Sequence, residues 1–122
     1  MALAFNIKAQ DIDFKNGFMH GGILNTAGDY KIEVINSYRN FIVYLYDKNN
    51  KPIPNKDITG EVSFYYNHDA SINLKLNAGE NQSFTAEVKN ANYYYCVVSF
   101  NIYGKPVSSK FFNLAEIAKK KK

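Results

Sequence analysis

The stretch Met19-His20-Gly21-Gly22 places two potential metal ligands beside two residues that give the backbone unusual freedom. A thioether and an imidazole are ligands that suit copper or zinc. Because neighbouring side chains of a strand point to opposite faces, both could reach one ion only through a turn or bulge, which the glycines would permit. Glu33, expected on the solvent-facing side of the following strand, is a candidate third ligand. These residues predict a copper or zinc site; the alternative is that Met19 packs and His20 is a surface residue before a turn.

Other residue types that carry chemistry do not form a recognisable catalytic pattern. The second histidine, His68, lies in a predicted Asn-His-Asp turn, and nothing beside it resembles a nucleophile elbow. The glycine pair does not belong to a phosphate-binding loop. A single cysteine, Cys96, excludes an intramolecular disulfide and a cysteine-based zinc site, and it shares an apolar face with Val98 and Phe100. We therefore predict a protein that is not an enzyme, with Cys96 in the core.

Tyrosine is the other distinctive feature, with 10 residues in the chain. Several tyrosines alternate with the aliphatic residues of predicted strands, so we expect them on the opposite faces. Such a face could stack sugars or form a protein interface, because tyrosine offers a large contact area at low entropic cost. Alternatively, tyrosine pairs across strands only stabilise an open sheet. The predicted interaction face consists of Tyr44, Tyr46, Tyr65, Tyr93 and Tyr95.

The elements that must position these residues are predicted by an alternation of period two, which is typical of half-buried antiparallel strands. Turn residues separate the runs, and Gly104-Lys105 predicts a tight type II′ hairpin. We expect an all-β, immunoglobulin-like antiparallel sandwich of about seven strands, and the pattern allows one further N-terminal edge strand within 14–24. The predicted strands are 30–34, 41–46, 62–66, 72–77, 84–88, 93–103 and 107–112.

Length and charge limit the domain organisation and the classes of partner. The 122 residues predict one β-sandwich domain at 18–112, preceded by an arm or edge segment at 1–17 and followed by a basic tail at 113–122. The formal net charge is +4, and Lys119–Lys122 supply that whole excess, so no basic face for a nucleic acid is expected. No apolar run approaches the ~20 residues of a membrane span. The first five residues lack the charged start of a signal peptide.

Two segments resemble a known family. They are 19–33, with its His-Gly-Gly opening and Tyr-Lys-Ile-Glu strand, and 43–62, with its Tyr-Asp turn, Lys-Pro pair and Thr-Gly strand start. Together they resemble the small bacterial envelope β-sandwich domains associated with heavy-metal efflux systems, over roughly residues 18–112. The resemblance implies an exported, metal-linked domain in the periplasm or cell envelope. His20 matches the family's first histidine and Glu33 is retained, whereas Lys31 stands at the second histidine and cannot bind a metal while protonated.

The sequence thus predicts a non-catalytic binding module of the bacterial cell envelope, with copper or zinc as the candidate cofactor. The alternative is an adhesion or protein-interaction module that works through a tyrosine-rich sheet face or an edge strand. In either case we expect a protein partner or self-association. We expect no nucleic acid, no membrane span and no small-molecule substrate.

Overall fold

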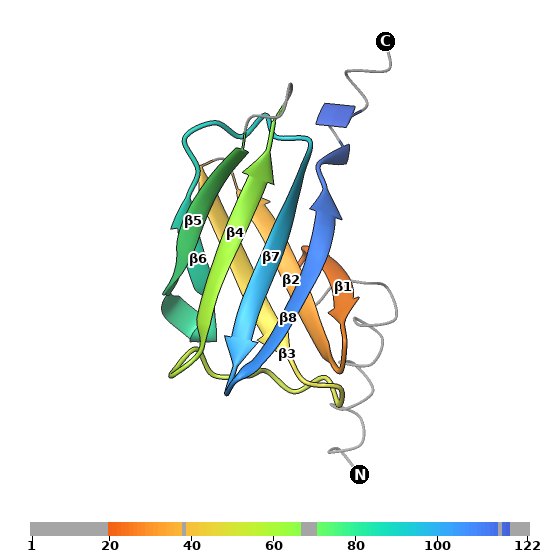
Figure 1. Ribbon diagram of the computed structural model, residues 1–122, viewed down its shortest axis with the longest axis vertical. Coiled ribbons are helices and arrows are strands. Elements are labelled where there is room, and N and C mark those ends of the chain that lie inside the picture. Colours follow the sequence, from red (N-terminus) through yellow and green to blue (C-terminus); the bar gives the residue numbers. More distant parts are fainter. Residues whose placement is uncertain (1–19, 38, 67–70, 115, 118–122) are drawn as a thin grey trace.

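The computed structural model describes residues 20–37, 39–66, 71–114, 116 and 117, and eight β-strands account for most of them (Figure 1). A short 3-10 turn, η2 (Glu80–Gln82), is inserted before the sixth strand. The predicted all-β class is confirmed. The strands are β1 (Ile23–Ala27), β2 (Tyr30–Ser37), β3 (Asn40–Tyr46), β4 (Thr59–Tyr65), β5 (Ser71–Ala78), β6 (Phe84–Glu87), β7 (Tyr95–Ile102) and β8 (Lys105–Phe112).

All neighbouring strands are antiparallel and form one sheet in the order β1-β2-β3-β6-β5-β4-β7-β8. The sheet curls until it is nearly barrel-shaped, so that β1-β2-β3-β6 lies behind β5-β4-β7-β8 in Figure 1. The two halves join where Asn77 and Ala78 of β5 pair with β6. At the other side, Asn25 Nδ2 of β1 donates to the Lys110 carbonyl of β8 at 2.7 Å. The eighth strand is β1, which shares only Ile23 and Leu24 with the predicted 14–24 segment, and positions 14–19 lie outside the described residues.

The core fills the space between the two halves with the inward residues of each strand. Phe41 and Phe64 meet edge to face with ring centroids 5.0 Å apart, and Phe84 contacts Phe100 at 4.7 Å. Cys96 is fully buried among them, as predicted, and burial raises the pKa of its thiol to about 12. A thiol with that pKa remains protonated at neutral pH, so Cys96 packs as a small apolar residue.

Short segments flank the sheet at both ends of the chain. A helical turn follows β8, where the Asn113 carbonyl accepts hydrogen bonds from the Glu116 and Ile117 amides. The predicted arm at 1–17 and the lysine run lie outside the described residues. Within the described part of the chain, no helix is long and apolar enough to cross a membrane.

The β7–β8 hairpin corrects one prediction about turn type. Its two central residues are Tyr103 and Gly104, and both have positive φ, at 51° and 91°. Positive φ at both positions defines a type I′ turn, whereas a type II′ turn needs it only at the first. The sequence did not predict a type I′ turn because tyrosine rarely adopts a positive φ. Tyr103 is 70% exposed, so packing does not compensate for the strain.

We therefore expect Tyr103→Asn to stabilise the protein by about 0.5–1 kcal/mol, because asparagine tolerates the left-handed region better than tyrosine. Tyr103→Val should destabilise it, since a β-branched side chain is disfavoured there. Urea unfolding of the three proteins measures both effects. Equal stability of the asparagine and valine variants would contradict the assigned turn.

Candidate functional site

A buried carboxylate lies on the side of β2 that faces away from the core. Glu33 is 0% exposed and accepts hydrogen bonds from three groups of the described residues. Its Oε2 accepts the backbone amides of His20 at 2.6 Å and Gly22 at 3.0 Å, and its Oε1 accepts the Tyr46 hydroxyl at 2.9 Å. Hydrogen bonds to a buried carboxylate are strong, and they offset the cost of removing its charge from water. Glu33 thereby fastens the segment before β1 onto β2 and β3.

The glycines of this segment allow its backbone to lie close to β2. A Cβ atom on Gly22 would lie 2.3 Å from the Val34 carbonyl oxygen, a distance too short for any side chain. Gly21 has a φ of +87°, the region that favours glycine. The His-Gly-Gly motif therefore has a structural task here, which is to lay its amides over the Glu33 carboxylate.

Tyr46 completes the cluster as a permanently protonated donor. Burial, followed by the hydrogen bond to Glu33 and the charge of that carboxylate, raises the pKa of the Tyr46 hydroxyl well above its usual range. A hydroxyl that does not ionise can donate to Glu33 at any physiological pH. This pair links β2 to β3 on the outer face of the sheet, in addition to the strand ladder.

The three predicted metal ligands have different outcomes. His20 is exposed, and its ring stacks on Tyr44 with centroids 3.8 Å apart and an interplanar angle of 18°. Met19 lies outside the described residues, as does His68. Glu33 is on the predicted face, but the expectation that it meets solvent is wrong, because the 20–22 segment and Tyr46 bond to it. Among the described residues, no three side chains of the histidine, cysteine, aspartate or glutamate types are grouped to hold an ion.

The five tyrosines predicted to form one interaction face do not lie together. Tyr46 and Tyr93 are buried, which corrects their predicted exposure. Tyr46 lies beside Pro52 of the following loop and donates a hydrogen bond to Glu33. A bend at Tyr94 breaks the alternation before β7. Tyr93 therefore packs against Phe64, with ring centroids 4.8 Å apart. Tyr44 is half-buried, and its ring stacks on that of His20.

The remaining two tyrosines form part of an aromatic row, defined as Tyr65, Tyr95 and Phe112. These residues are paired in register across β4, β7 and β8. Tyr65 and Tyr95 stack at 4.6 Å with an interplanar angle of 13°, and Tyr95 lies 6.1 Å from Phe112. The Lys110 ammonium sits over Tyr95 at 4.6 Å and over Phe112 at 5.6 Å, within cation–π range. Sequence reasoning missed Phe112 and Lys110, although Phe112 follows the same alternation.

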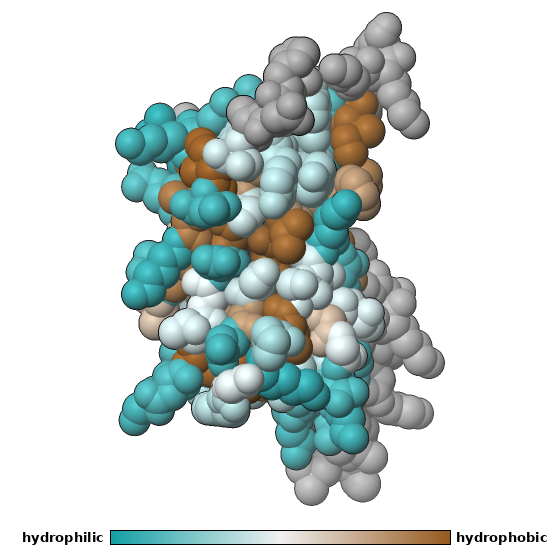
Figure 2. Space-filling view, in the orientation of Figure 1, coloured by the Kyte–Doolittle hydropathy of each residue, from teal (hydrophilic) through white to brown (hydrophobic). Residues whose placement is uncertain are grey.

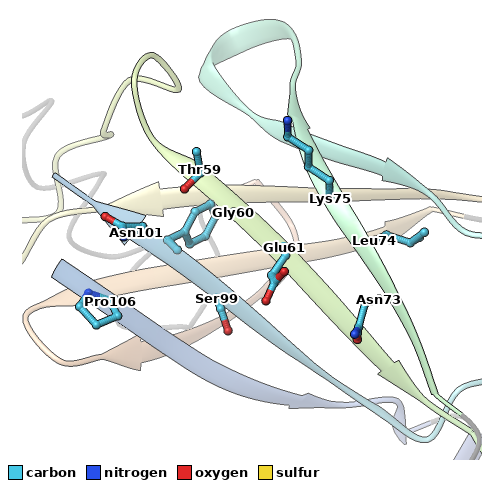
Figure 3. Close-up of a pocket in the computed structure, with 10 residues that line it drawn as sticks. Thr59, Gly60, Glu61, Asn73, Leu74, Lys75, Ser99, Asn101 and Pro106 are labelled. Atoms are coloured by element: carbon cyan, nitrogen blue, oxygen red, sulfur yellow. The ribbon is translucent and has the colours of Figure 1, made fainter. Parts of the chain in front are cut away.

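A shallow depression of about 510 Å³ is lined by residues of the same four strands, β4, β5, β7 and β8 (Figure 3). Short polar side chains, among them Thr59, Asn73 and Ser99, line it together with Glu61 and Lys75. In Figure 2 the surface over these strands shows pale, near-neutral residues interrupted by brown, hydrophobic patches, with many strongly hydrophilic groups along one side and at the lower end. The outer face of β5-β4-β7-β8 therefore offers aromatic groups at one end and small polar groups at the other.

The Glu33 cluster makes a stability prediction. Tyr46→Phe should cost about 1–2 kcal/mol, because it removes one donor from a buried charge, and Glu33→Gln should cost a similar amount. Tyr44→Phe is the matched control on the same strand face and should stay within about 0.5 kcal/mol of the parent. Urea unfolding gives all three values. If Tyr46→Phe cost no more than Tyr44→Phe, the hydroxyl would not be holding the carboxylate.

The cluster also bears on the predicted copper or zinc site, which stays a prediction. To bind an ion, Glu33 would have to release hydrogen bonds that hold the 20–22 segment. Met19, the other predicted ligand, lies outside the described residues. On this prediction, native mass spectrometry with micromolar Zn(II) or anaerobic Cu(I) should show one retained stoichiometric ion that disappears in His20→Ala. The absence of a retained ion would contradict the predicted site.

Comparisons with protein-family models, with curated proteins and with solved structures found no match.

Proposed function

We propose that this chain is a non-catalytic, immunoglobulin-like binding module whose outer face on β5-β4-β7-β8 docks a protein partner. The observation that carries the proposal is the aromatic row beside a sheet surface that is poor in charge. The row offers an exposed apolar ring, Phe112, and a cation, Lys110. A complementary partner would present an apolar side chain to Phe112 and a carboxylate to Lys110.

The strand order supports the immunoglobulin-like part of the proposal. If β2 is taken as the first strand of such a domain, β2-β3-β6 corresponds to its A-B-E sheet. The other half, β5-β4-β7-β8, then corresponds to C′-C-F-G. On this assignment β1 is an addition at the A edge. The order in which the chain visits these strands agrees with this assignment.

The composition of the outer face supports a protein partner. Of the side chains that point outward from β4, β5, β7 and β8, Glu61, Lys75 and Lys110 carry charge, and most others are Ser, Thr, Asn or aromatic. Depletion of charge and enrichment of aromatic residues mark the centres of protein interfaces. Tyrosine, serine and asparagine together also dominate antibody contact surfaces, where they give area and adaptable hydrogen bonds.

The ring geometry favours a protein over a sugar. Sugar stacking requires a free aromatic face, whereas Tyr95 is covered by Tyr65 from one neighbouring strand and by Lys110 from the other. The central ring of the row is therefore not open for stacking, and the exposed ring is Phe112. Catalysis is not part of the proposal, since the described lining of the depression contains Glu61 but neither histidine nor cysteine to act beside it.

We extend the proposal to the periplasm or cell envelope on the family resemblance. The residues that carry its first segment, His20 to Gly22 and Glu33, contact one another directly, which supports their inheritance as one structural unit. The proposed module keeps this unit as a scaffold, and its binding surface lies on the opposite half of the sheet.

Site-specific photo-crosslinking in cells that produce the full chain tests the proposal. A crosslinking amino acid at Phe112 should give one discrete protein adduct, and the same group at Ser37, exposed on the opposite outer face, should give none. Tyr95→Ser should remove most of that adduct, because truncating a central tyrosine of an interface weakens binding by about tenfold or more. Equal adducts from both positions, or no adduct at Phe112, would refute the proposed face.

A further inference from the structure

A second surface, independent of the aromatic row, lies along the free edge of β5. Residues Ser71–Leu76 pair with β4 on one side. On the other side, β6 reaches only Asn77 and Ala78, so among the described residues no strand covers the edge of Ser71–Leu76. No strand in the described part of the chain pairs with the backbone amides and carbonyls that point away from β4 there. A row of this kind is a template for another strand.

The edge lacks the features that usually prevent such pairing. Ser71–Leu76 contains neither proline nor glycine, its register with β4 is regular without a bulge, and Lys75 is its one charge. Ile72, on the core side of the strand opposite Phe64, is nevertheless 46% exposed. Leu74, two residues further along the same side, is half-buried. The strand therefore offers apolar side chains next to unpaired backbone, which natural edges generally avoid.

We propose that β5 pairs antiparallel with β5 of a second copy of this chain, about a two-fold axis at Asn73. This register sets Ile72 against the partner's Leu74, Ser71 against the partner's Lys75, and the two Asn73 residues against each other. Apolar residues then lie together on the core side, and no like charges are opposed. The contact is self-complementary, as a closed two-fold dimer requires.

Other registers fit less well, for reasons visible in the strand. A shift by one residue would move the apolar side chains to the opposite face. An axis at Leu74 would require Asn77 to pair with Ser71, but β6 already occupies the edge at Asn77. An axis at Ile72 would leave fewer residue pairs. The Asn73 axis uses five residues of each copy, a short contact that implies a dimer in the micromolar to millimolar range.

Sedimentation velocity of the full chain from about 10 μM to about 1 mM spans that range. We expect a concentration-dependent dimer. Asn73→Asp and Asn73→Lys should each weaken it by about tenfold or more, because like charges meet on the axis, while an equimolar mixture of the two should associate again. Ser108→Asp, exposed on β8 of the same half-sheet, is the matched control and should dimerise like the parent. Circular dichroism verifies that each variant is folded.

Disulfide trapping tests the register directly. Asn73→Cys should form a symmetric crosslinked dimer under mild oxidation and Ser108→Cys should not, since residues opposed across antiparallel strands have Cα atoms about 4.5–5.5 Å apart. The native thiol is buried and does not interfere. A chain that stays monomeric throughout, or a dimer unaffected by Asn73→Asp, would overturn the proposal. So would a dimer abolished by Tyr95→Ser, which would assign self-association to the aromatic row instead.

Discussion

The Glu33 carboxylate is the constraint on which one half of this structure depends. A charge removed from water must be matched by donors, and Glu33 has two backbone amides and one tyrosine hydroxyl. These donors come from before β1 and from the end of β3, so three chain segments have one mutually consistent arrangement. The position of the 20–22 segment in turn sets where β1 begins. From β1, Asn25 reaches Lys110 of β8 and brings the two ends of the sheet together.

This arrangement makes the two outer faces of the molecule unequal. On the β1-β2-β3 half, the 20–22 segment lies over β2, and His20 covers one side of Tyr44. On the β5-β4-β7-β8 half, Phe112 is exposed and Ser99 is half-buried. The proposed docking face therefore lies on the half without the buried charge.

Alternation of residue types was sufficient to predict the strands and most of the core. In a half-buried strand every second side chain is buried, so apolar residues recur with a period of two that is visible in the local sequence. Glu33 and Tyr46 show the limit of that signal. Period two places both correctly on the outer side of their strands, but it cannot show that a glycine segment and a loop cover that side. Tyr93 fails for another reason, since the bend at Tyr94 shifts the alternation by a backbone change that no residue type there announces. The Gly21-Gly22 pair, one strand before Glu33, is the available clue, because such a pair lets backbone amides approach a carboxylate as well as allowing a metal site.

The free edge of β5 and the aromatic row belong to the same half of the sheet, and this has a consequence for binding. Pairing through β5 would join two copies of β5-β4-β7-β8 into one continuous surface that carries two aromatic rows. A partner with repeated or two-fold symmetric sites could then engage both rows, and the second contact would form at a high effective concentration without any new interaction. A face that binds weakly as a monomer would bind strongly as a dimer. In such a module affinity would depend on the concentration of the chain itself, because the short β5 contact sets the fraction that is paired.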